Sequence, residues 1–258
     1  MKKHFPNTLT CCNLLCGCFA TLAAYRGDYT AALLFIMTGA VFDFFDGFAA
    51  RLLHVSSPIG KELDSLADNV TFGFAPATIV FSLMRNCATQ CGTTAGAGCA
   101  MYDADGACPL STLVSSPAGQ WLPYVAFLIS AFSALRLAKF NLDERQTTSF
   151  IGLPTPANAL FWAAAAYGLH NGGINPPSSA PLLALLFAGT LLCCYLLVSE
   201  IPMFALKFKS FGWKGNELRY TFIAVSAALI ALFGVVAFSA VIVLYVLTSV
   251  CANFFKKK

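Results

Sequence analysis

Four aspartates lie close together in a chain that is otherwise strongly apolar. They are Asp43, Asp46, Asp64 and Asp68. At the centre of a membrane-spanning helix each carboxylate costs roughly 2.5 to 3.5 kcal/mol on insertion scales, so a cluster of four needs a compensating partner. Carboxylate oxygens are hard ligands, and the partner that suits them is a divalent cation such as magnesium or manganese. The residue types therefore predict a metal site.

The spacing of these aspartates supports a shared site. The first two are three residues apart and the last two are four apart, so on helices each pair lies on one face. Two such helices facing each other would bring all four carboxylates together. Gly47 and Ala50 leave a smooth helix surface beside the first pair, where a flat ring or a phosphate can approach the backbone. Arg51 follows at once and carries a guanidinium that can bind phosphate.

The aspartates belong to a longer pattern with fixed spacing. It reads Asp43-x2-Asp46-Gly47-x2-Ala50-Arg51-x8-Gly60-x3-Asp64-x3-Asp68. At every position this pattern resembles the signature of the CDP-alcohol phosphotransferase family of integral membrane enzymes. The resemblance implies two divalent ions, magnesium or manganese, with Asp43, Asp46 and Asp64 chiefly as ligands. It implies that Asp68 is the general base and also touches the second ion.

Three further stretches resemble one branch of that family, the bacterial CDP-diacylglycerol:serine O-phosphatidyltransferases. They are Pro6 to Thr10 followed by Asn13 to Gly17, then Ala134 to Asn141, then Phe150 to Ala157. The resemblance implies transfer of the phosphatidyl group of CDP-diacylglycerol to L-serine, with release of CMP, by direct displacement. It also implies a homodimer.

The resemblance assigns residues to the donor substrate. CDP-diacylglycerol is expected to contact Asn7, Thr10, Gly47, Arg51 and Ser57. For Asn7, Thr10 and Ser57 an alternative interpretation is helix capping, and the two roles can coexist. His54, beside the motif, receives no role, because the family pattern does not require it.

The acceptor is expected to contact Arg136, Lys139 and Asn141. Arg136 would bind the serine carboxylate or the donor phosphate, and its alternative is snorkelling to lipid phosphates. The branch more often has arginine where Lys139 stands, and this departure keeps the charge but loses the bidentate fork. Asn141 would orient the acceptor.

The composition indicates a polytopic membrane protein. Hydrophobic residues make up 58% of the chain and charged residues only 11%, with a mean hydropathy of +0.71. An ordinary soluble domain has roughly a quarter charged residues. At about 20 residues for each span, we expect an all-α bundle of about eight transmembrane helices and a single domain over residues 1–258. The predicted spans are 9–25, 29–53, 62–84, 121–138, 151–170, 180–198, 218–233 and 235–254, with a tight hairpin at Gly234.

The distribution of lysine and arginine predicts the orientation in the membrane. If the N-terminus is inside, fourteen of the sixteen fall in inner segments, and only Arg26 and Arg85 fall in outer ones. This positive-inside bias places both termini in the cytoplasm and the aspartate motif at the cytoplasmic face of the cell inner membrane. The first 25 residues could instead be a signal peptide, but polar residues such as Asn7 and Asn13 favour an uncleaved span.

Four cysteines fall in the predicted outer loop between the third and fourth spans. They are Cys87, Cys91, Cys99 and Cys108. In an oxidising compartment they could form one or two disulfides, whose pairing the sequence does not settle. The other cysteines lie in predicted spans and are expected to pack as small apolar residues.

Two other functions are alternatives to serine transfer. A different acceptor, such as glycerol 3-phosphate or inositol phosphate, would need further cations, which Arg136, Lys139 and Arg145 could supply. An ion or metal transporter also places aspartates in the membrane. A transport pathway would distribute them through the depth of the bilayer, whereas here they are bunched at one face. Nothing in the sequence indicates nucleic-acid binding.

Overall fold

The computed structural model describes residues 4–55, 57–93, 119–142, 150–171, 179–203 and 216–256. Within these ranges the chain is almost entirely helical, with one antiparallel pair of short strands. In chain order the elements are α1 (His4–Tyr25), α2 (Tyr29–Leu52), α3 (Pro58–Asp68), the π-helix η1 (Asn69–Phe74), α4 (Ala75–Thr93), the 3-10 helix η2 (Gly119–Phe127), α6 (Leu128–Leu142), β1 (Phe150–Ile151), α7 (Thr155–Asn171), α8 (Ser179–Val198), β2 (Pro202–Met203), α9 (Glu217–Phe233), the 3-10 turn η4 (Gly234–Val236) and α10 (Ala237–Lys256). The predicted all-α class is confirmed for this part of the chain.

Six helical stretches in the described part of the chain are long and apolar enough to cross a membrane. The sequence predicted eight spans. The difference arises at α7, which has 17 residues, and at the α9–α10 region, which forms one apolar stretch from Glu217 to Cys251. The number of spans and the orientation of the termini stay predictions.

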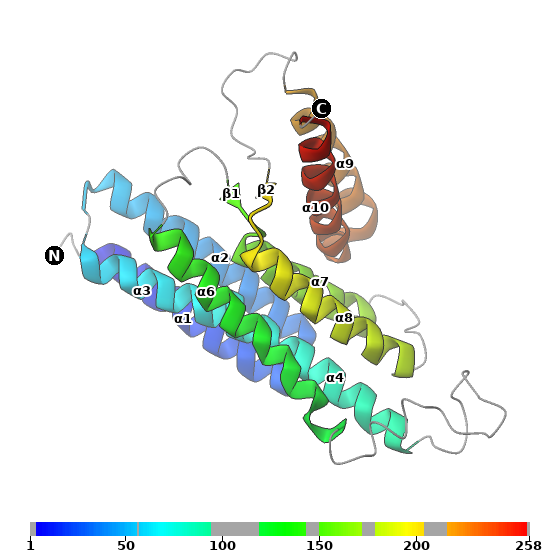
Figure 1. Ribbon diagram of the computed structural model, residues 1–258. Helices are drawn as coiled ribbons and strands as arrows, with labels where there is room; N and C mark the ends of the chain where they lie inside the picture. Colours follow the sequence, from blue (N-terminus) through cyan, green and yellow to red (C-terminus); the bar gives the residue numbers. More distant parts are fainter. Residues whose placement is uncertain are drawn as a thin grey trace.

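The helices form a bundle and a separate hairpin (Figure 1). Helices α1 to α8 lie side by side in the bundle, and α9 and α10 stand at one side of it against α7. The reversal between α9 and α10 is at Gly234, whose φ of 60° lies in the left-handed region that glycine adopts without a Cβ penalty. The hairpin predicted at Gly234 is confirmed.

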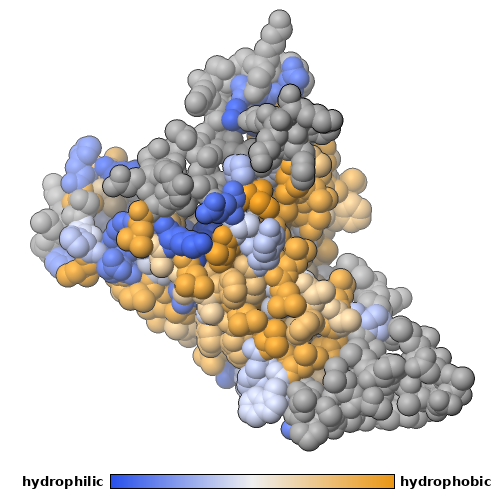
Figure 2. Space-filling view, viewed as in Figure 1, coloured by the Kyte–Doolittle hydropathy of each residue, from blue (hydrophilic) through white to orange (hydrophobic). Residues whose placement is uncertain are grey.

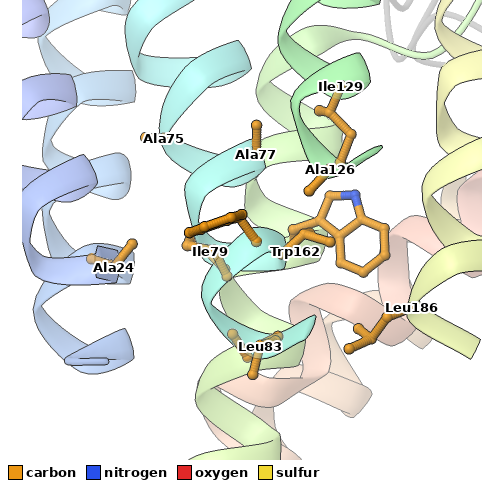
Figure 3. Packing of buried hydrophobic residues seen from close by; sticks show 14 of the residues in the cluster. Ala24, Ala75, Ala77, Ile79, Leu83, Ala126, Ile129, Trp162 and Leu186 are labelled. Carbon is orange, nitrogen blue, oxygen red and sulfur yellow. The ribbon is translucent and has the colours of Figure 1, made fainter. Parts of the chain in front are cut away.

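Helix α4 is the centre of the bundle. In the stretch that contains it, Pro58–Thr89, 72% of the most apolar 18-residue segment is buried inside the protein. The corresponding share is 28% for the stretch that contains α2. A helix that is apolar on all sides and surrounded by others is expected at the core. Figure 3 shows Ile79 and Leu83 of α4 in the packed interior, with the indole of Trp162 near Ala126 and Ile129.

The chain between the aspartate motif and this core helix contains a wide turn. The predicted span at 62–84 is one continuous helical run, but residues 69–74 form a π-helix immediately after Asp68. Such turns are rare and frequently occur at functional sites. The helix also continues to Thr93, beyond the predicted end of the span at residue 84. Hydropathy does not detect this extension, because a helix that extends out of the apolar layer can continue with polar residues. Cys87 and Cys91, expected in a loop, are therefore in α4.

The disulfide prediction falls mostly outside the described residues. Cys99, Cys108 and the side chain of Cys91 lie there, and Cys87 is buried in α4. The predicted disulfides therefore stay a prediction.

The start of α7 is tied to the end of α8. Gly152 has a φ of 73°, and a Cβ there would lie 2.9 Å from the carbonyl oxygens of Leu197 and Ser199. Its backbone N–H donates to the carbonyl of Ile201 at 3.0 Å, beside the β1–β2 pair. Helix α7 then begins at Thr155, four residues after the predicted start of the span at 151, with Pro156 in its first turn, where the missing N–H is tolerated.

Candidate functional site

Three of the four motif aspartates converge between α2 and α3. Carboxylate oxygens of Asp43, Asp64 and Asp68 all lie within 4.8 Å of one another. The spacing of Asp64 and Asp68 explains part of this, because residues four apart on α3 share one helix face. The fourth, Asp46, lies outside this group but beside it, and is 5% exposed. Its Oδ2 accepts a hydrogen bond from the Thr10 hydroxyl at 2.7 Å.

The cluster fits a divalent cation. Three carboxylates at this separation repel one another unless a positive charge lies between them. Asp64 Oδ1 is buried and, among the described residues, has no hydrogen-bond partner. A buried carboxylate oxygen left unpaired is costly, and coordination of a hard cation removes the cost. Asp43, Asp64 and Asp68 are therefore the residues that would hold the ion.

A cavity of about 230 Å³ opens beside the cluster. Asp46 and Asp64 line it, so the cavity reaches the carboxylates. Four of the five residues predicted to contact the donor also line it, namely Asn7, Thr10, Gly47 and Ser57. They come from α1, α2 and the turn before α3, which the chain brings together at one end of the bundle. Figure 2 shows hydrophilic residues gathered toward that end, over the ends of α2, α3 and α6.

Two glycines shape the cavity in different ways. A Cβ added at Gly47 would meet nothing within 4 Å, so this glycine keeps an open surface on α2. A Cβ at Gly60 would lie 2.9 Å from Ser57 Oγ and 3.1 Å from Asn7 Oδ1, so that glycine permits a close approach of α1 to α3. Both allow backbone to lie against a bound group.

The capping alternative holds for Ser57 alone. Its Oγ accepts a hydrogen bond from the Gly60 N–H at 3.0 Å at the start of α3, while the residue also lines the cavity. Asn7 and Thr10 lie inside α1, which begins at His4, so neither caps this helix. Thr10 instead hydrogen-bonds to Asp46, a contact that was not predicted.

Arg51 is not placed on this cavity. Its Nε donates to the Gly47 carbonyl at 3.0 Å, and the exposed side chain lies with Phe48, Leu52 and His54 at a separate cavity of about 370 Å³. Arg51 stands in the last turn of α2, where a cation is favourable to the helix dipole. Its predicted contact with the donor stays a prediction.

The three predicted acceptor residues lie at different places on α6. Arg136 is 8% exposed and lies within electrostatic range of Tyr245 of α10 and of Asp68, and its Nε is buried without a hydrogen-bond partner among the described residues. Lys139 is exposed. Asn141 donates from its amide to Ser65 Oγ at 2.8 Å, and its carbonyl accepts from Lys61 Nζ at 3.3 Å, so it joins the end of α6 to α3.

The sequence interpretation gave no role to two residues at the site. Lys61 lines the cavity, and its Nζ donates to the Asn141 carbonyl. Asn13 is fully buried and donates a hydrogen bond to Asp68 Oδ1 at 3.1 Å. A signal for Asn13 was available, because it lies three residues after Thr10 and shares its helix face.

Comparison with known proteins gives a consistent picture. Residues 3–199 match the CDP-alcohol phosphatidyltransferase family. The chain is 32% identical over 203 residues to a Bacillus subtilis protein named CDP-diacylglycerol–serine O-phosphatidyltransferase, covering 77% of this chain and 89% of that protein. A protein of the same name from Mycobacterium leprae is 28% identical over 205 residues, covering 77% and 57%. One from Saccharomyces cerevisiae is 41% identical over 87 residues, covering 31% and 32%.

Proposed function

The chain belongs to the CDP-alcohol phosphatidyltransferase family, and from this premise we propose that it transfers the phosphatidyl group of CDP-diacylglycerol to L-serine. The products would be phosphatidylserine and CMP. The observation that carries the proposal is the convergence of Asp43, Asp64 and Asp68 beside a cavity that residues of the donor motif line. The relatives' names support serine as the acceptor.

The proposed setting is the cell inner membrane. Six apolar helical stretches support a membrane location, and the excess of lysine and arginine in predicted inner segments supports a site that faces the cytoplasm. The lipid donor would reach the cavity from the bilayer, and serine would reach it from the aqueous side. We propose residues 1–258 as one domain, working as a homodimer.

The aspartates would hold the metal and the donor pyrophosphate together. A bound magnesium or manganese ion, or a pair of them, would supply Lewis-acid neutralisation of charge on the pyrophosphate oxygens. Asp43, Asp64 and Asp68 are the ligands supported by distance, and Asp46, which lines the cavity beside them, would be the fourth. Asn7, Gly47, Ser57 and Gly60 would bind the cytidine nucleotide along the same wall.

Asp68 would act on the acceptor. It would take the proton of the serine hydroxyl while that oxygen bonds to the phosphorus that carries diacylglycerol, and the bond from this phosphorus to the CMP oxygen would break. The donor-cavity residues include no cysteine or histidine that could act as an activated nucleophile, so a direct displacement is favoured over a covalent enzyme intermediate.

Arg136 is the best-supported contact for the serine carboxylate. It is a buried cation with an unpaired Nε among the described residues, and it lies near Asp68. A guanidinium binds a carboxylate with two parallel hydrogen bonds. Lys139 is exposed, and the amide of Asn141 already donates to Ser65, so both have weaker support as acceptor contacts.

The test is an acceptor panel with purified protein in mixed micelles. CDP-diacylglycerol and manganese would be supplied with serine, glycerol 3-phosphate, inositol phosphate or no acceptor, while CMP is quantified and the lipid product is identified by mass spectrometry. We expect CMP and phosphatidylserine in equal amounts, and only in the sample whose acceptor is serine. If CMP forms with a phosphorylated acceptor instead, the chain would still be a CDP-alcohol phosphatidyltransferase, but serine would be the wrong acceptor.

A further inference from the structure

Asn13 makes two hydrogen bonds at the proposed general base, one from its side chain to Asp68 and one through its backbone carbonyl to the turn that follows. Its side chain is fully buried, and the amide donates to Asp68 Oδ1 at 3.1 Å. Its backbone carbonyl accepts a hydrogen bond from the Thr71 hydroxyl at 2.9 Å. Thr71 lies in η1, three residues after Asp68, and is itself fully buried. One residue of α1 therefore contacts both the carboxylate and the wide turn that follows it.

The packing around this contact is tight. A Cβ at Gly17 would lie 2.8 Å from the Cα of Thr71. A Cβ at Gly39 would lie 2.7 Å from Thr71 Cγ2 and 3.0 Å from Asn13 Oδ1. Small residues on α1 and α2 thus let both helices close on η1. The Asn13 side chain has little room to adopt another rotamer, so its hydrogen bond has a fixed direction.

The same face of α1 also contacts the other half of the motif. Thr10, three residues before Asn13, donates to Asp46 Oδ2 at 2.7 Å. Asp46 comes from the pair on α2 and Asp68 from the pair on α3. A single helix face, defined by Thr10 and Asn13, therefore binds one carboxylate of each pair and sets how the pairs face each other.

We infer that Asn13 is a positioning residue, which fixes the Asp68 carboxylate in the orientation that metal binding and acceptor deprotonation require. The inference rests on the proposed function for the second of these roles. Outer hydrogen bonds to ligating carboxylates fix their orientation, and their loss typically costs about 10- to 100-fold in metal affinity or activity. A carboxylate free to rotate loses this advantage even though every ligand remains.

The test uses an isosteric change and a matched control. Asn13→Asp keeps the size of the side chain and replaces the donor NH2 by an oxygen that cannot donate when ionised. Asn13→Ala removes the donor without adding a charge, and serves if the first variant fails to fold. The control is Thr71→Val, which removes the hydrogen bond to the Asn13 carbonyl and leaves the amide on Asp68 intact.

Three measurements separate positioning from packing. Manganese binding would be followed through the electron paramagnetic resonance signal of the free ion, without substrates. Turnover and the KM for CDP-diacylglycerol come from CMP release, and folding from thermal unfolding. We expect both Asn13 variants to bind manganese and turn over about 10- to 100-fold more weakly, with a KM for the donor within about threefold. Thr71→Val should retain both properties within about threefold.

Two results would overturn the inference. One is wild-type manganese affinity and turnover in folded Asn13→Asp or Asn13→Ala. The other is an equal loss in Thr71→Val, which would make the role of Asn13 one of packing between α1 and η1. Because manganese binding needs no substrate, it tests Asn13 even if serine proves to be the wrong acceptor.

Discussion

The helical bundle and the α9–α10 hairpin differ in the groups that their polar side chains bind. In the bundle, buried side chains of α1 bond across helices to carboxylates, Asn13 to Asp68 and Thr10 to Asp46. In the hairpin, hydroxyls bond to backbone carbonyls, those of Thr248 and Ser249 within α10 and that of Ser239 to Phe161 of α7. Among the six apolar stretches of the described chain, the hairpin stretch has the highest mean hydropathy, 2.8. Only 6% of its most apolar 18-residue segment is buried inside the protein.

This difference indicates that the bundle carries the chemistry and that the hairpin serves as an apolar anchor. Polar groups inside an apolar bundle are expensive, and a cluster of them with unpaired atoms indicates a binding site. The family match ends at residue 199, before the hairpin begins. Changes at the bundle site should therefore affect catalysis far more than changes in the hairpin.

The largest effect is expected at the proposed base. Asp68→Asn should lower turnover by roughly 10²- to 10⁴-fold, because general bases typically contribute that much. Asp43→Asn and Asp64→Asn should weaken manganese binding as well as turnover. Steady-state CMP release with a manganese titration checks all three. A folded Asp68→Asn protein that retains more than about a tenth of wild-type turnover would argue against the base assignment.

A smaller and more selective effect is expected at Arg136. A charged hydrogen bond is worth roughly 1.5 to 3 kcal/mol, so Arg136→Ala should raise the KM for serine about 10- to 100-fold where KM follows binding. The KM for CDP-diacylglycerol should change less, and Arg136→Lys should rescue only partly, because lysine lacks the bidentate fork. If donor binding is lost while serine affinity is unchanged, Arg136 belongs to the donor phosphate.

The same substitution, glycine to alanine, should change the free energy of unfolding differently at two positions of α2. At Gly39 an added methyl meets Thr71 and Asn13, so Gly39→Ala should destabilise the fold by about 1 to 3 kcal/mol. At Gly47 there is open space, so Gly47→Ala should leave stability unchanged or raise it by up to about 1 kcal/mol. Thermal unfolding in detergent measures both. Equal destabilisation would show that α2 is packed as tightly at the cavity as in the bundle.

The smallest effect is expected in the hairpin. Leu247 of α10 is 57% exposed and lines an apolar groove between α9 and α10. Leu247→Ala should leave serine-dependent CMP release within about twofold of wild type, because an exposed side chain in lipid loses little on truncation. A tenfold loss of turnover in a folded protein would mean that the hairpin takes part in the site, and the contrast with the bundle would fail.

Sequence reasoning located the carboxylates well, because helix periodicity alone determines which residues share a face. It therefore anticipated a carboxylate cluster from all four aspartates, of which Asp43, Asp64 and Asp68 meet while Asp46 lies beside them, and it expected a helix near that of α7, although four residues too early. These features depend on local backbone chemistry.

The contacts of α1 were not predictable in the same way. The bond from Thr10 to Asp46 and that from Asn13 to Asp68 join residues 36 and 55 positions apart, so they depend on how helices pack. The π-helix after Asp68 leaves the hydropathy pattern unchanged and gives no sequence signal. The direction of the long Arg51 side chain also depends on tertiary surroundings, here the Gly47 carbonyl.

The stereochemical course at phosphorus tests the central claim most directly. A CDP-diacylglycerol analogue with a chiral phosphorothioate at the phosphorus that carries diacylglycerol would be incubated with the protein, a divalent metal and serine. A single direct displacement at the carboxylate site predicts thio-phosphatidylserine with inverted configuration. Retention would require a covalent enzyme intermediate, for which the described residues lining the donor cavity offer no cysteine or histidine, and would contradict the account.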